Sequence, residues 1–422
     1  MQAKNIAVFA AIVMFTVALG TVLSTTRTGH RPSDGRIQLT VGGHYNAEWI
    51  KQVQGLCDKF SRNNPKIVVT VVGVPGNYYE KVLVMMAGRT APDLMWMGKG
   101  FAQFASRDAF LDVEDQFDID PADYYMRAVD SYRFNGRLQG FPYAGDFAAI
   151  IYNVDILEAA GVDPPHDDWT VDDFRRTAQR LTRRDTAGDV VHWGYRGIFD
   201  EGAFGADFLN EDMTRHRLDK PEWLNFFNFI LAMKYEDRST PTQSHVERSG
   251  MLTDLQAFMQ GKVAMISSGT NYFPTLRETI KDFRWDIVTM PRGVRPSCES
   301  STGGFAIWKH TPHPQQAAGL LQFLASPAGQ LCLAGTGVPS HRQTARRFVE
   351  TMPAPPRRVE AMLQSMECLN PAPRHPRLNE LERAIDETMR LILERKQTPE
   401  QALQMCGKQF EKILSREYTM GR

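Results

Sequence analysis

Strands and helices alternate along the first quarter of the chain, and this alternation constrains the fold more than any other feature. Apolar, often β-branched runs predict strands at residues 37–41, 66–74 and 93–97. Apolar side chains at helical spacing predict helices at 49–60, 78–86 and 101–110. Such alternation with short turns predicts right-handed βαβ units, and therefore an α/β fold with a mainly parallel sheet flanked by helices. Ligands of such sheets bind at the carboxyl ends of the strands.

The rest of the chain continues with strands and then becomes mainly helical. Further strands are predicted at 147–153, 263–266, 285–290 and 304–308, and further helices at 155–160, 222–235, 250–260 and within 315–422. Thr170 is expected to cap a helix, because Asp173 lies three residues further on as in a capping box. The length of 422 residues predicts two or three domains. Lys+Arg and Asp+Glu both number 49, so no basic excess is present for binding nucleic acid.

The N-terminus has the pattern of an export signal. Lys4 precedes an apolar run over residues 6–23, which predicts a signal peptide or an uncleaved membrane anchor at 1–24, followed by a linker at 25–35. The protein is therefore expected in the periplasm. The five cysteines include no C-x-x-C pair, so no zinc ribbon is predicted, and a Cys298–Cys332 disulfide would be one pairing in an exported protein.

Motifs of common enzymes are missing from the sequence. It contains no H-E-x-x-H, G-x-S-x-G or Walker A motif, so we expect no catalytic residues, no cofactor and no metal site. The acidic pairs 167–168 and 172–173 are interpreted as charges at a helix N-terminus. An exported hydrolase of glycosides stays as an alternative; it would need paired carboxylates, for which Asp146 and Asp207 are the candidates.

Aromatic residues gather near predicted turns and strand ends. They are Tyr45, Tyr78, Tyr79, Trp96, Tyr143, Trp193, Phe204, Tyr272 and Phe273. Each ring alone is usually a packing residue, but a set at the strand ends of an α/β protein could form stacking platforms. Sugars suit such platforms, because their C–H faces stack on rings while their hydroxyls need polar partners.

Several segments resemble the extracytoplasmic solute-binding proteins of ATP-driven carbohydrate importers, the maltose-binding type. They are residues 135–142, 151–157, 160–165, 169–174, 258–265 with Gly269, 303–307, 323–330 and 398–403. The resemblance implies a two-lobed periplasmic binding protein-like fold of type II that closes on its ligand like a hinge. By the same resemblance, the first lobe comprises 36–145 and 292–345, and the second lobe comprises 146–291 and 346–422.

The resemblance also implies partners. The protein would capture a sugar, oligosaccharide or related polyol, act as a monomer, and deliver the ligand to the permease of an ABC importer without a reaction. A sensor or adhesin with the same fold but without transport is the other alternative. Lys99 stands where the family often has an acidic residue, so an anionic sugar or a glycerol-phosphate-like ligand is also considered.

The ligand-binding residues are expected where turns of the two lobes converge. In the first lobe these are His44, Tyr45, Asn46, Tyr78, Tyr79, Trp96, Met97 and Lys99. Asn46 has an alternative role as a helix cap, and one of the two tyrosines is expected to face the core. The remaining candidates are Tyr143, Asp146, Trp193, Phe204, Asp207, Gly269, Asn271, Tyr272, Gly303 and Gly304. Asp146 is the main polar candidate, because the family's acidic residue in this loop accepts hydrogen bonds from sugar hydroxyls.

Overall fold

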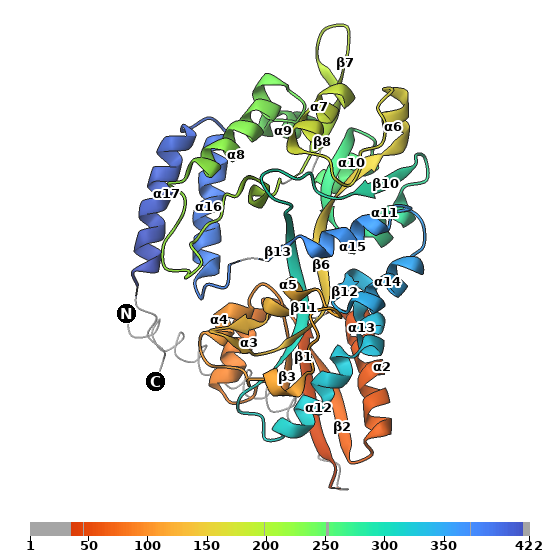
Figure 1. Cartoon of the computed structure of the whole chain (residues 1–422), viewed down its shortest axis with the longest axis vertical. Helices are drawn as coiled ribbons and strands as arrows, with labels where there is room; N and C mark the ends of the chain where they lie inside the picture. Colours follow the sequence, from red (N-terminus) through yellow and green to blue (C-terminus); the bar gives the residue numbers. More distant parts are fainter. Residues whose placement is uncertain (1–34, 45, 198, 250–252, 372, 417–422) are drawn as a thin grey trace, which may run out of the picture.

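The computed structural model describes residues 35–44, 46–197, 199–249, 253–371 and 373–416, which form an elongated molecule with two lobes (Figure 1). The predicted export signal, nearly all of the linker and Tyr45 lie outside the described residues. No helix in the described part of the chain combines the length and apolarity needed to cross a bilayer.

The alternation predicted for the first lobe is present. The strands are β1 (Ile37–His44), β2 (Ile67–Val74) and β3 (Leu94–Met97), and the helices are α2 (Ala47–Asn63), α3 (Tyr78–Ala87) and α4 (Phe101–Ala105). The one clear difference is α4, which ends five residues before the predicted boundary. Asp108 there adopts a left-handed backbone with φ of 54°, which a continuing helix cannot accommodate.

Two long strands connect the lobes (Figure 1). Strand β6 (Phe141–Asn153) pairs with β11 (Cys298–Ile307) in the antiparallel sense, and its other half pairs with β9 (Val263–Gly269). The main path of the sheet runs β2-β1-β3-β11-β6-β9-β8-β7. Its β1–β2, β1–β3 and β8–β9 pairs are parallel as expected, whereas the crossing strands are antiparallel, so the complete sheet is mixed.

The sheet is continuous, but the apolar side chains form two separate cores. The first core contains Leu39, Leu94 and Phe305. The second contains Trp223 and Met265, together with buried side chains of the C-terminal helices. Strand β6 contributes to both, because its first residues lie in the first core and its last residues in the second. The two cores agree with the predicted two-lobed α/β fold.

Helices cover the second core on several sides (Figure 1). They include α6 (Val154–Ala159), α7 (Val171–Leu181), α8 (Pro221–Leu231), α9 (Gln243–Ser249), α10 (Asp254–Met259) and α11 (Phe273–Thr279). The later helices α14 (Arg342–Glu350), α15 (Glu360–Glu367), α16 (Leu378–Leu393) and α17 (Pro399–Leu414) also pack on the second core, whereas α12 (Pro314–Ala325) and α13 (Pro327–Leu333) pack on the first. Shorter strands are β4 (Arg133–Phe134), β5 (Arg137–Leu138), β7 (Arg183–Arg184), β8 (Val190–Arg196), β10 (Trp285–Val288), β12 (Val338–Pro339) and β13 (Leu369–Pro371).

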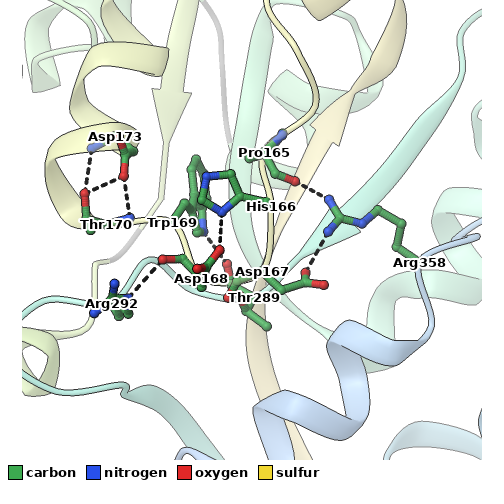
Figure 2. Close-up of polar contacts among 10 residues, drawn as sticks. All are labelled: Pro165, His166, Asp167, Asp168, Trp169, Thr170, Asp173, Thr289, Arg292 and Arg358. Carbon is green, nitrogen blue, oxygen red and sulfur yellow. Dashed lines mark hydrogen bonds and ion pairs between the residues drawn. The ribbon is translucent and has the colours of Figure 1, made fainter.

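Of the two acidic pairs predicted as charges at a helix N-terminus, only the second lies in the first turn of α7 (Figure 2). The capping box is confirmed: the Thr170 hydroxyl and backbone N–H both bind the Asp173 carboxylate, and Asp173 N–H donates to Thr170 Oγ1. Asp167 instead forms an ion pair with Arg358, 2.9 Å away, and Asp168 contacts the His166 ring. The first acidic pair is therefore wrongly interpreted as helix charge, because these side chains lie ahead of the first turn.

The predicted disulfide is wrong. Cys298 and Cys332 are both free thiols, the first buried on β11 and the second exposed on α13. The Cys298 thiol donates a hydrogen bond to the carbonyl oxygen of Ser365 at 3.4 Å.

Candidate ligand-binding site

An aromatic cluster of candidate residues forms where β1 and β3 end. The His44 ring lies 4.5 Å from the Trp96 ring and 4.7 Å from the Tyr78 ring, measured between centroids. Tyr78 is buried and donates to the carbonyl of Trp96 at 3.0 Å, so it is the member of the tyrosine pair that faces the core. Tyr79 is less buried, and its ring lies 6.1 Å from His44. Burial lowers the pKa of His44, which favours a neutral ring.

Two first-lobe candidates, Asn46 and Met97, have structural roles. The Asn46 side chain accepts a hydrogen bond from the Trp49 N–H at 3.0 Å and caps α2, which was its alternative role. The Met97 side chain is fully buried in the first core. Its carbonyl accepts a hydrogen bond from the Tyr132 hydroxyl.

Tyr143 extends the aromatic cluster onto β6. The Trp96 indole donates to the Tyr143 hydroxyl at 3.1 Å. A Cβ at Gly303 on β11 would lie 3.0 Å from this hydroxyl oxygen and 3.4 Å from the indole nitrogen, so the glycine leaves space beside both. Gly304 is different, because its Cβ would lie 2.4 Å from the carbonyl oxygen of Phe141 and it is therefore fixed by strand packing.

Asp146, the main polar candidate, binds the loop after β9. Its carboxylate accepts the Thr270 hydroxyl at 2.7 Å and the backbone N–H groups of Thr270, Asn271 and Phe147. A Cβ at Gly269 would lie 3.2 Å from both carboxylate oxygens, so the glycine permits this approach. Burial raises the pKa of Asp146 in spite of these donors. Thr270 was missed, because one hydroxyl in a loop carries no signal of its tertiary partner.

The loop that follows has one exposed ring. Tyr272 is 43% exposed, whereas Phe273 is buried in the second core. The strand pairing Ala148–Gly269 fixes this loop beside Asp146. The second-lobe loop and the crossing strand thus form one polar unit.

Trp193 and Phe204 lie away from this unit. Trp193 on β8 pairs with Val263 at the start of β9. The loop beside Asp146 follows Gly269, at the opposite end of β9. The Trp193 ring contacts His245, with centroids 5.1 Å apart. The Phe204 ring packs against Phe229 at 5.2 Å, beside the second core. Neither ring is brought to the aromatic cluster.

Asp207 and Lys99, both predicted from the sequence as ligand-binding residues, line a cavity of about 670 Å³. Lys99 follows β3 of the first lobe and forms an ion pair with Glu299 of β11 at 3.1 Å. Asp207 belongs to the second lobe and forms an ion pair with Arg295. The other lining residues are Asp200, Glu201, Ala206, Phe208, Leu209, Asn210, Glu211, Met213, Arg217, Ser300, Asn370, Pro373, Glu382, Ile385, Asp386 and Met389. Because its walls come from both lobes, this is the inter-lobe cavity.

The inter-lobe cavity and Asp146 share the same strand ladder. Asp146 is opposite Ser301 on β11, and Ala144 is opposite Gly303. Glu299 lies two residues before Ser301, so its side chain points to the same face of the sheet. The aromatic cluster, Asp146 and the cavity therefore follow one another along β6 and β11.

The family model and the related sequences all point to bacterial binding proteins. The family model described as bacterial extracellular solute-binding protein matches residues 46–331. The chain is 24% identical over 290 residues to the melibiose/raffinose/stachyose-binding protein MelE of Bacillus subtilis, covering 63% of this chain and 65% of MelE. A binding protein of Brucella abortus is 22% identical over 315 residues, 69% of this chain and 72% of that protein.

Solved structures share the fold. An ABC substrate-binding protein of Listeria monocytogenes, in complex with cycloalternan, superimposes with a TM-score of 0.75 at 21% identity. The match covers 90% of this chain and 100% of the Listeria chain. The predicted two-lobed architecture is thereby confirmed.

Proposed function

Because the chain belongs to the bacterial extracellular solute-binding protein family, we propose that it captures a sugar, oligosaccharide or related polyol between its lobes and delivers it to an ABC permease. Members of this family act outside the cytoplasm, in agreement with the export pattern of the N-terminus. The protein would act as a monomer and release its ligand chemically unchanged.

One observation carries this proposal: the rings at the ends of β1 and β3 reach the crossing strand β6 through Tyr143, and the carboxylate of Asp146 lies on the same strand. The rings of His44, Trp96 and Tyr143 come from the first lobe. Asp146 binds the loop of the second lobe through Thr270. A sugar matches this arrangement, because its C–H faces stack on rings and its hydroxyls donate hydrogen bonds to a carboxylate.

The mechanism follows from contacts that need both lobes. A ligand that touches the first-lobe rings and the second-lobe loop has its full set of contacts only when the lobes are close together. Such a ligand binds the closed form more tightly and shifts the population towards it. The permease would then recognise the closed form.

Calorimetry of the exported protein with a panel of neutral mono-, di- and trisaccharides and polyols tests the proposal. We expect at least one to bind. We expect Asp146→Asn to weaken that binding by about 10- to 100-fold, because a charged acceptor is replaced by a neutral one. Asp58→Asn is the matched control, since Asp58 lies exposed on α2. Binding of amino acids alone, or an Asp146→Asn variant with unchanged affinity, would contradict the proposed site.

A further inference from the structure

Carboxylates outnumber cations in the wall of the inter-lobe cavity. Seven acidic residues line it: Asp200, Glu201, Asp207, Glu211, Glu299, Glu382 and Asp386. Three cations line it: Lys99, Arg217 and Arg295. The chain as a whole has no net charge, so this excess of acid is local to the cavity.

Two of the three cations are already paired. Lys99 pairs with Glu299 at 3.1 Å, and Arg295 pairs with Asp207. Lys99 is therefore a poor candidate for binding an anionic sugar, because its charge is compensated and further acids surround it. The sequence-based idea of an anionic ligand has no support in this arrangement.

Neighbouring carboxyls in the cavity wall raise one another's pKa. Burial raises the pKa of Glu201 to about 8, and the charge of Asp200 adds to the effect. Burial also raises the pKa of Glu382, with Asp386 adding and Lys99 opposing. A bound cation would relieve this repulsion and stabilise the ionised carboxylates.

A buried hydroxyl in the cavity wall independently indicates a missing polar partner. Ser300 is 4% exposed, and its Oγ has no hydrogen-bond partner among the described residues. Ser300 lines both the inter-lobe cavity and a smaller adjoining cavity. Leaving such a hydroxyl unsatisfied is costly, so a polar ligand group would stabilise the site.

A metal-binding site does not account for the excess of carboxylates in the cavity wall. Within the described ranges, no group of three or more His, Cys, Asp or Glu side chains is placed to hold one. The carboxylates are instead distributed around a cavity of about 670 Å³, the size of a small organic molecule.

We propose that the inter-lobe cavity selects sugars that carry a protonated amine over neutral sugars of the same size. This inference rests on the proposed function, because it takes the ligand to be a sugar. The amine would lie among the carboxyls of Glu201, Glu382 and Asp386, while the hydroxyls meet the remaining polar groups. The acidic wall would also repel phosphorylated and carboxylated sugars.

Calorimetry with matched disaccharides tests the inference. The three ligands are the β-1,4-linked glucosamine disaccharide with free amines, its N-acetylated form and cellobiose, each at pH 6.5, where the amines are protonated. We expect the free-amine sugar to bind at least tenfold more tightly than the other two. The advantage should shrink in 0.5 M NaCl, since salt screens charge interactions.

Two variants test whether the charge of the cavity wall, and not a general loss of stability, sets the preference for the amine. Glu382→Gln should reduce the ratio of free-amine to neutral affinity by at least threefold, and Asp386→Asn should act in the same direction. Glu367→Gln is the control, because Glu367 pairs with Arg342 and does not line the cavity. Equal or tighter binding of the neutral or N-acetylated sugar would overturn the inference and leave the proposed function standing. Binding of no sugar at all would overturn both.

Discussion

At the residue scale, the environment of Glu201 opposes ionisation of its carboxyl. Its pKa rises from the ordinary 4.5 to about 8, first through burial and then through Asp200, Glu299 and Asp207. Between these two pH values the unfolded chain has lost the proton while the folded protein keeps it, so the folded state loses stability as pH rises. Above about pH 8 the full cost is present.

Replacing Glu201 with Gln removes this cost. We expect Glu201→Gln to raise the free energy of unfolding by about 1–3 kcal/mol at pH 8.5, because each pKa unit corresponds to about 1.4 kcal/mol and the group keeps some solvent contact. Urea titrations at pH 4 and pH 8.5 measure the difference. At pH 4 both states are protonated, so the gain should vanish; a gain of equal size at both pH values would show that packing and not charge is responsible.

Residues of the candidate site differ in how well the sequence predicts them. Asp146, His44 and Trp96 follow strands or lie in a segment with family resemblance, and the structure brings each beside other candidates. Thr270 could not be predicted, because its partner Asp146 lies 124 positions away, and neither could Glu382, because Lys99 beside it is distant in the sequence. The ligand contacts themselves stay predictions.

At the element scale, β8 packs directly on the backbone of α7. A Cβ at Gly194 would lie 1.9 Å from the carbonyl oxygen of Ala178, so the two elements can meet only at a glycine. We expect Gly194→Ala to destabilise the protein by about 3 kcal/mol or more, since overpacking here displaces a backbone. Urea denaturation of the purified variant measures this loss.

Gly55 provides the matched control in an exposed position of α2. A Cβ there meets no atom within 4 Å, and the residue is inside a helix. Gly55→Ala should therefore stabilise by about 0.5–1 kcal/mol. A Gly194→Ala variant as stable as the wild type would show that β8 and α7 can separate without cost.

Helices of this chain were easier to predict than its crossing strands. Helix α3 begins at the predicted residue and α2 extends the predicted apolar face by two to three residues at each end, because the helical period is visible in a single segment. Strand β6 begins six residues earlier than predicted and β11 also six. Pro142, Gly145 and Gly303 resemble turn residues, and their pairing partners lie more than 150 positions away.

At the scale of the whole molecule, β6 contributes to both cores, and the mechanism proposed above moves one lobe against the other. We expect a bound sugar to lower the radius of gyration measured by small-angle scattering, because the closed form is more compact. Asp146→Asn at the same sugar concentration should remain in the more extended form. A scattering profile unchanged by a sugar that calorimetry shows to bind would contradict the hinge mechanism.

The position of β11 also affects the order in which the chain can fold during translation. This strand lies between β3 and β6 in the sheet, yet the ribosome synthesises it about 200 residues after β3. The second core waits even longer, because it includes Phe410 of α17. Neither core can therefore be completed until most of the polypeptide has emerged, and the nascent chain exposes apolar surface for most of its synthesis.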